Sequence, residues 1–147
     1  MEHKIKMIGL DLDGTLLTDK KELTARTKAV ISRALSQGIV VLVATGRPWM
    51  GIPEELRNFP GMRYALTSNG ARVIDTQENR VIEEHLLSPR LALKVLETCG
   101  KYDTLQEVYF DGQGYAPADK MNCVERYHRN PGMCEYMRNT RIPVENI

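Results

Sequence analysis

The stretch Gly9-Leu10-Asp11-Leu12-Asp13-Gly14-Thr15-Leu16-Leu17 closes an apolar run with two carboxylates one residue apart. If residues 5–10 form a buried strand, side chains two positions apart leave on the same side, so both acids project from its carboxyl end. Two like charges that close repel each other, and a hard divalent cation such as Mg2+ would relieve the repulsion. The pair Asp11 and Asp13 therefore predicts a metal site, with Gly14 turning the backbone away and Thr15 offering a hydroxyl to the carboxylates.

A second polar ending follows the next apolar run. Residues 39–43 are continuously aliphatic, the pattern of a strand buried on both faces of a parallel sheet, and Thr45-Gly46-Arg47-Pro48 follow. Pro48 suits the first position of a helix, which we predict to run to about Arg57. A helix start binds anions, and here a hydroxyl, a close backbone N–H and a guanidinium would meet a phosphate. Because carboxyl ends of neighbouring strands lie side by side, metal and phosphate would meet at one edge of the sheet.

The pattern around these two endings is that of an α/β fold with a doubly wound parallel sheet. Thr24 is a good N-cap for a helix ended by Gly38, and a third strand is predicted over residues 64–67. The β-α-β-α-β order favours parallel strands joined by crossovers. The apolar helix face that would cover the sheet consists of Val30, Ile31, Ala34 and Leu35. Val73-Ile74 and Val81-Ile82 predict a hairpin at the sheet edge.

The pattern changes near residues 84–88, and we expect two domains, 1–85 and 86–147. Ser88-Pro89 predicts the start of a helix over 89–99 with an inward face of Leu91, Val95 and Leu96. A hairpin over 108–115, a helix over 119–128, a break at 130–132, a short helix over 134–137 and a strand from 142 follow. This second part reads as an α+β lobe.

Composition excludes some partners. Twenty Lys and Arg against nineteen Asp and Glu give a formal net charge of +1, so we expect no nucleic-acid partner and no anionic-membrane partner. The apolar run near the amino terminus, which ends at Asp11, is too short for the apolar segment and cleavage site of a signal peptide. No apolar stretch reaches membrane-spanning length, so we expect a cytoplasmic protein. Cys99, Cys123 and Cys134 should be reduced thiols. A zinc site at Cys123, His128 and Cys134 is disfavoured because a fourth ligand at a familiar spacing is lacking.

Three motifs together resemble the haloacid dehalogenase (HAD) superfamily, and most closely its Cof-type sugar-phosphate phosphatases. They are Asp11-Leu12-Asp13-Gly14-Thr15-Leu16-Leu17, Thr45-Gly46-Arg47-Pro48 and Ser68-Asn69-Gly70-Ala71. The resemblance implies that Asp11 is the nucleophile that takes the phosphoryl group, and that Asp13 acts as general acid and base. It also implies that Asp11 and Asp13 bind Mg2+, Asp13 through its main-chain carbonyl. The residues it assigns to phosphate are Leu12, Thr45, Gly46 and Arg47, and Asn69 is a candidate substrate contact.

The resemblance implies a Mg2+-dependent phosphatase of small phosphorylated metabolites, with sugar phosphates as the expected substrates and residues 86–147 as part of a substrate-specificity cap. Family members continue into further core strands with a phosphate-binding lysine and an acidic Gly-Asp motif. No residue of this chain occupies those positions, so the sequence resembles only the N-terminal half. Two alternatives stay open: a phosphosugar mutase, and a truncated, non-catalytic chain with weak metal or phosphate binding. The missing strands also predict self-association through an uncovered sheet edge.

Overall fold

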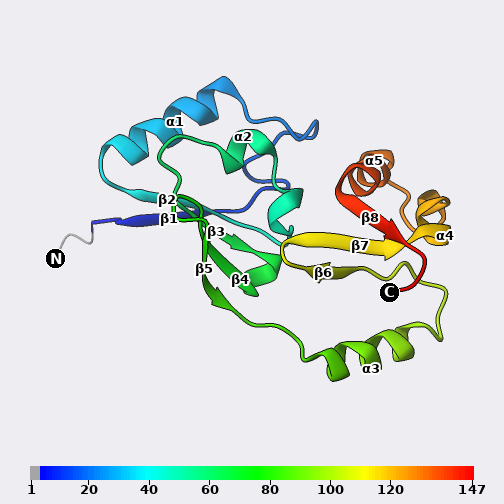
Figure 1. Cartoon of the computed structure of the whole chain (residues 1–147). Helices are drawn as coiled ribbons and strands as arrows, with labels where there is room; N and C mark the ends of the chain where they lie inside the picture. The colour runs from blue at the N-terminus through cyan, green and yellow to red at the C-terminus, as the bar shows by residue number, and fades with distance from the viewer. Residues whose placement is uncertain (1–3) are drawn as a thin grey trace. The chain divides into compact units, whose positions relative to one another are not determined.

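The computed structural model of the protein describes residues 4–147, which form two compact units (Figure 1). The first unit runs up to Arg47 and continues through Ile52–His85, and the second comprises Pro48–Gly51 and Leu86–Ile147. Residues 48–51 group with the second unit, where the Met50 N–H donates to the Gly112 carbonyl at 3.1 Å. The roles of core and cap for the two parts stay predictions.

The first unit is built on one five-stranded sheet with the strand order β1-β2-β3-β4-β5. β1 pairs parallel with β2 and β2 parallel with β3, as the alternating order predicted, and β4 and β5 form the predicted antiparallel hairpin at the edge. The strands are Met7–Leu10, Val40–Ala44, Tyr64–Thr67, Arg72–Asp75 and Arg80–Glu84. The α/β fold class is thus confirmed, with β1, β2 and β3 ending at the same side.

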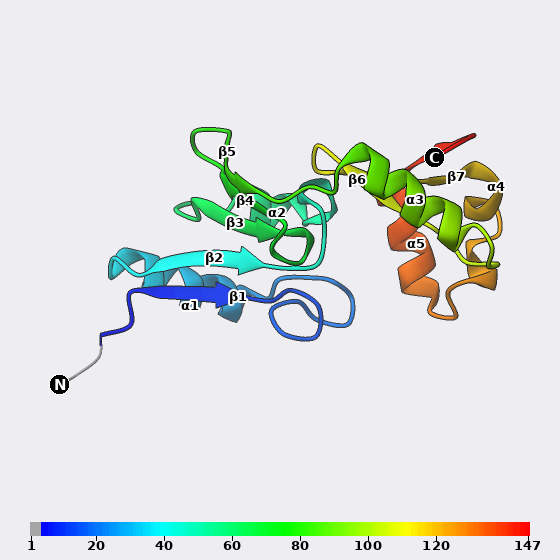
Figure 2. The ribbon, with the colours of Figure 1, turned by 90° about the horizontal axis from the view of Figure 1, so that it is seen from below.

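The helices α1 (Ala25–Ser36) and α2 (Glu54–Arg57) lie over the same face of this sheet (Figure 1), and Figure 2 views the strands from the other side. Thr24 caps α1 as predicted, with its side chain accepting from the Thr27 N–H at 3.1 Å. Ile31 on α1 is buried, and so are Val41 and Val43 on β2. Val30, which is expected to point inward, is 61% exposed. Successive residues of a helix point in different directions, and in this pair Ile31 is the buried one.

The predicted helix over 48–57 is wrong. The segment forms a 3-10 turn, η1 (Trp49–Gly51), and then the separate four-residue α2. Pro53 separates them, since a proline disfavours helical geometry at the preceding Ile52 and suits the position before a helix start. No α-helix begins at Pro48, so the expected anion site at a helix N-terminus there is wrong, and any phosphate contact of this segment comes from its loop.

The second unit contains the three-stranded sheet β6-β7-β8, in which β6 pairs antiparallel and β8 parallel with β7. The strands are Val108–Phe110, Gln113–Pro117 and Arg141–Val144, and the helices are α3 (Pro89–Cys99), α4 (Ala118–Met121), η3 (Val124–Arg126) and α5 (Pro131–Thr140). The helix expected over 119–128 is two short turns instead. The expected break at 130–132 is a helix start, because Asn130 caps α5 and Pro131 takes its first position.

Helix α3 has the predicted limits but not the predicted burial. Its side chains include no buried residue, and Leu91 and Val95, expected inward, are 47% and 43% exposed. The core of this unit lies elsewhere and consists of Ala116, Met121, Val124, Cys134 and Met137. The apolar spacing of α3 thus indicates a helix whose apolar side remains exposed in the part of the chain that the structure describes. Among residues 4–147, no helix has the length and apolarity needed to traverse a membrane.

Candidate active site

The loop after β1 places the first two candidate residues. The strand ends at Leu10, and three main-chain N–H groups, of Thr15, Leu16 and Leu17, converge on the Leu12 carbonyl at 3.4, 3.2 and 2.9 Å. Gly14 takes a φ of 76°, a left-handed conformation that glycine adopts without strain. The side chain of Leu12 is fully buried, so any contact of this residue with phosphate would come from its main chain. The loop therefore holds its backbone tightly while both acids stay exposed.

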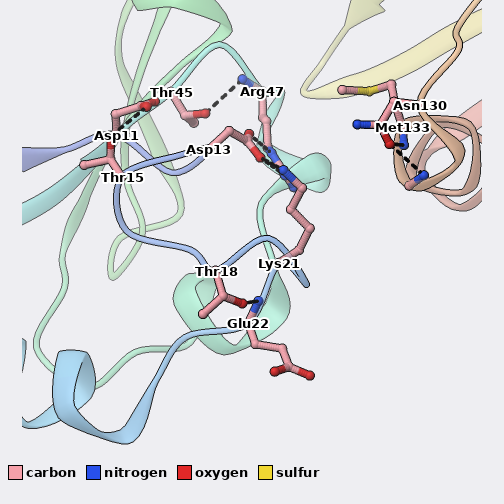
Figure 3. Close-up of polar contacts among 11 residues, drawn as sticks. Asp11, Asp13, Thr15, Thr18, Lys21, Glu22, Thr45, Arg47, Asn130 and Met133 are labelled. Carbon is pink, nitrogen blue, oxygen red and sulfur yellow. Dashed lines mark hydrogen bonds and ion pairs between the residues drawn. The ribbon is translucent and has the colours of Figure 1, made fainter.

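Asp13 is held by two cations (Figure 3). The Arg47 guanidinium donates from Nε to Oδ2 and from Nη2 to Oδ1, both at 2.7 Å, and Lys21 Nζ lies 2.6 Å from Oδ1. The hydrogen bond from Arg47 is the main reason that the pKa of Asp13 falls from 3.8 to about 2, with Lys21 acting in the same direction and partial burial opposing both. Asp13 is therefore an ionised carboxylate in a bidentate, charge-assisted pair.

Asp11 has a different neighbour. Its Oδ2 accepts from the Thr15 hydroxyl at 3.4 Å, the partner that the sequence suggested. Since β1 ends at Leu10, the alternation of side chains along a strand does not determine where Asp13 points, and the two acids turn to separate partners. Figure 3 shows Asp11, Asp13, Thr45 and Arg47 gathered where β1 and β2 end.

The loop after β2, Thr45-Gly46-Arg47, which we call the β2 exit loop, faces Asp13 through Arg47. Thr45 is buried, and its hydroxyl accepts from the Arg47 N–H at 3.2 Å. The Arg47 side chain is 10% exposed, so its position is well defined by packing. The structure thus brings together Asp13 and the β2 exit loop, 34 residues later in the chain.

The third motif also reaches this loop. The Ser68 N–H donates to the Arg47 carbonyl at 2.9 Å, and the Asn69 N–H donates to the Thr45 carbonyl at 3.2 Å. A Cβ atom on Gly46 would lie 2.8 Å from Asn69 Oδ1, so only glycine fits there while Asn69 keeps its place. Asn69, the candidate substrate contact, is therefore packed against the β2 exit loop.

Lys21 is the site residue that sequence reasoning missed. Residues 18–21 read only as a polar turn, and the pairing with Asp13 depends on a left-handed φ of 63° at Lys21. The turn is closed by the Lys21 N–H to the Thr18 carbonyl at 2.8 Å and by the Thr18 N–H to the Glu22 carbonyl at 3.0 Å. Lysine is not among the residue types enriched in that conformation, so the contact could be found only from the structure.

The donor set suits a magnesium ion in part. Mg2+ binds through one or two protein oxygens and keeps waters and substrate phosphate as its other ligands. The exposed carboxylate of Asp11 has the chemistry of such a ligand, whereas the Asp13 side chain is engaged by Arg47 and Lys21, so Asp13 would offer its main-chain carbonyl. Within residues 4–147, no group of three or more His, Cys, Asp or Glu side chains gathers. Cys123 and Cys134 direct their Sγ atoms to the carbonyls of Asp119 and His128.

Comparison with known proteins places the chain in a family. The family model of haloacid dehalogenase-like hydrolases matches residues 8–145. A 5-amino-6-(5-phospho-D-ribitylamino)uracil phosphatase of Bacillus subtilis (strain 168) is 32% identical over 76% of this chain and 43% of its own length. The phosphatase YwpJ of the same organism is 27% identical over 77% of this chain and 39% of its own length. Among solved structures, a haloacid dehalogenase-like hydrolase from B. subtilis superposes with a TM-score of 0.76 at 22% identity, over 97% of this chain and 55% of that one.

The family model spans both the acids that follow β1 and the threonine-glycine-arginine loop that follows β2. The chain belongs to the haloacid dehalogenase-like hydrolases. It spans less than half the length of the curated relatives it matches.

Proposed function

We propose that this protein takes part in Mg2+-dependent hydrolysis of phosphate monoesters through an aspartyl-phosphate intermediate. The observation that carries the proposal is the meeting of Asp13 with Arg47, which joins the ends of β1 and β2 where Asp11 and Thr45 also lie. A carboxylate nucleophile, a second carboxyl for proton transfer and phosphate-binding groups are what phosphoryl transfer through an enzyme carboxylate needs. The family membership supports the same reaction class.

In this mechanism Asp11 attacks phosphorus, and the bond from phosphorus to the ester oxygen breaks. Asp13, as the carboxylic acid, gives its proton to the leaving oxygen, and then accepts a proton from the water that attacks the phosphoryl group on Asp11. The bond between phosphorus and the Asp11 carboxylate oxygen breaks as water attacks, so inorganic phosphate leaves and Asp11 is regenerated. Thr45, Arg47 and the main-chain N–H groups of Leu12 and Gly46 would bind the phosphoryl oxygens. Mg2+, when bound, would offset the negative charge of those oxygens.

The ion pairs of Asp13 mean that the structure is not the proton-donating state. A carboxylate held by Arg47 and Lys21 is ionised, so it has no proton to give. A substrate phosphate would compete for both cations, because a dianion binds the same guanidinium fork and ammonium. Release of Asp13 from that pairing is therefore the step that would prepare it as the general acid.

We further propose that the substrate is a phosphate ester of a small polyhydroxylated metabolite, such as a sugar phosphate. The resemblance to Cof-type proteins favours sugar phosphates, and the name of one relative specifies a phospho-D-ribityl compound. A phosphosugar mutase stays the enzymatic alternative. It would need a bisphosphate activator and would release little free phosphate.

The test is phosphate release from p-nitrophenyl phosphate and from a panel of sugar phosphates, with Mg2+ or with a chelator. We expect slow release that depends on Mg2+ and that is lost in Asp11→Asn. Asp19→Asn is the matched control, because it removes an exposed acid from the loop that follows the same motif. Turnover that survives in Asp11→Asn would contradict the proposal. Phosphate binding without turnover in the unaltered chain would favour the non-catalytic alternative.

A further inference from the structure

The segment Ser68-Asn69-Gly70, which follows β3 and which we call the strap, has an unusual backbone. All three residues have left-handed conformations, with φ values of 52°, 56° and 89°. Glycine adopts this region without cost and asparagine tolerates it, but serine does so seldom. A strained residue such as Ser68 persists only where surrounding contacts determine its backbone, and such residues gather at functional sites.

The strap contacts the β2 exit loop at three points. The Ser68 N–H binds the Arg47 carbonyl and the Asn69 N–H binds the Thr45 carbonyl, at 2.9 and 3.2 Å. The Asn69 side chain occupies the space beside Gly46, with Oδ1 2.8 Å and Cγ 3.4 Å from where a Cβ would stand. The two carbonyls that accept these bonds belong to the residues on either side of Gly46. The strap therefore contacts all three residues of the β2 exit loop.

From these contacts we propose that Asn69 is a positioning residue that fixes the β2 exit loop, and through it Arg47, for phosphate. This role differs from the direct substrate contact that the sequence suggested. That this positioning serves phosphate binding rests on the proposed function, whereas the positioning of the loop by Asn69 rests on the contacts alone. An exposed residue with this backbone can form the contact because its main chain binds Thr45 while its side chain lies against Gly46.

Amide hydrogen exchange by NMR tests whether Asn69 fixes the β2 exit loop. Asn69→Gly keeps a residue that accepts the left-handed backbone and removes only the side chain. We expect exchange of the Ser68 and Arg47 amides to quicken by roughly tenfold, because local opening of the loop becomes easier. Asn79→Gly is the matched control: Asn79 has a φ of 47° in the turn between β4 and β5, and its substitution should leave those two amides unchanged. Unchanged exchange in Asn69→Gly would overturn the inference.

A double-mutant cycle tests the contact itself. Gly46→Ala introduces a Cβ against Asn69 Oδ1, so alone it should also quicken exchange of the Ser68 amide. In Gly46→Ala/Asn69→Gly the opposing side chain is absent, and the two effects should not add. Additive effects would show that the side chains do not meet, and would count against the inference.

Binding of inorganic phosphate in the presence of Mg2+ tests whether the positioned loop serves phosphate binding. We expect Asn69→Gly to weaken phosphate binding by roughly tenfold, since displacement of a binding loop by a fraction of an ångström is costly. Unchanged binding with faster amide exchange would overturn the positioning role for phosphate. If the unaltered chain binds no phosphate, the proposed function fails, while the exchange experiment still decides whether Asn69 fixes the loop.

Discussion

Asp13 and its two cations define the chemistry available at the scale of single residues. If Asp13 transfers protons, Asp13→Asn should lower turnover of p-nitrophenyl phosphate by about 10²–10⁴-fold, the usual contribution of general acid and base catalysis. Some turnover should remain, because Asp11 can still attack an ester with a good leaving group. Steady-state rates of Asp13→Asn and Asp11→Asn, measured side by side, check this. Equal and complete loss in Asp13→Asn and Asp11→Asn would assign Asp13 an indispensable role instead.

Lys21 should stabilise the folded state in a way that depends on pH. The folded pKa of Asp13 is about 2 against an ordinary 3.8, so its ion pairs contribute stability above about pH 4, which is lost as the pH falls toward 2. Lys21→Met should lower the free energy of unfolding by less than about 1 kcal/mol near neutral pH, because both side chains are more than 40% exposed. Urea unfolding at a series of pH values measures this.

The control for that series is Lys20→Met, the neighbouring lysine in the same turn. The difference between the unaltered chain and Lys21→Met should shrink between about pH 4 and pH 2, and Lys20→Met should show no such trend. A difference that stays constant through this range would mean that Lys21 acts through packing and not through the charge of Asp13.

At the scale of elements, helices α1 and α3 offer a matched pair. Each begins at a hydroxyl N-cap, with Thr24 accepting from Thr27 and Ser88 from Leu91. Thr24→Ala should lower the free energy of global unfolding by about 1 kcal/mol, because α1 buries Ile31 in the core. Ser88→Ala should reduce helicity without moving the global transition, because α3 buries no residue. Circular dichroism and thermal unfolding of both variants check this, and equal shifts would contradict it.

These same elements show how much of the structure could be predicted. Limits set by local chemistry were predicted: the caps at Thr24 and Ser88, the parallel strands, and the hairpin of β4 and β5. The prediction of one helix over 48–57 rests on Pro48 as a helix start and is wrong because Pro53 interrupts the segment. Burial of α3 and of Val30 depends on which surfaces lie nearby, and periodicity alone does not contain that information.

At the candidate site, the residues of the three motifs could be chosen from the sequence, but not their partners. Pairing of Arg47 with Asp13 follows from adjacent strand ends, yet the sequence suggested phosphate as its only partner. The contact of Lys21 with Asp13 and the position of Asn69 beside Gly46 both depend on left-handed residues in loops. Loop geometry of that kind comes from tertiary contacts, which a single sequence does not display.

At the scale of the whole molecule, the strand order leaves β1 at one edge of the five-stranded sheet. Within the described residues no strand pairs with its outer side, and Met7 on this strand is 58% exposed. An apolar edge strand with unpaired main-chain groups is a template for association with a second copy. We therefore expect association that grows with protein concentration, detectable by light scattering or sedimentation.

Met7→Lys should reduce that association, because a lysine on an edge strand opposes pairing with another strand through charge and solvation. Val30→Lys is the matched control, since Val30 is 61% exposed but belongs to helix α1 and not to a strand. Equal reduction by both variants would indicate general surface stickiness in place of edge pairing. A monomer at all concentrations in the unaltered chain would show that the β1 edge is protected without any partner, and the prediction of self-association would be wrong.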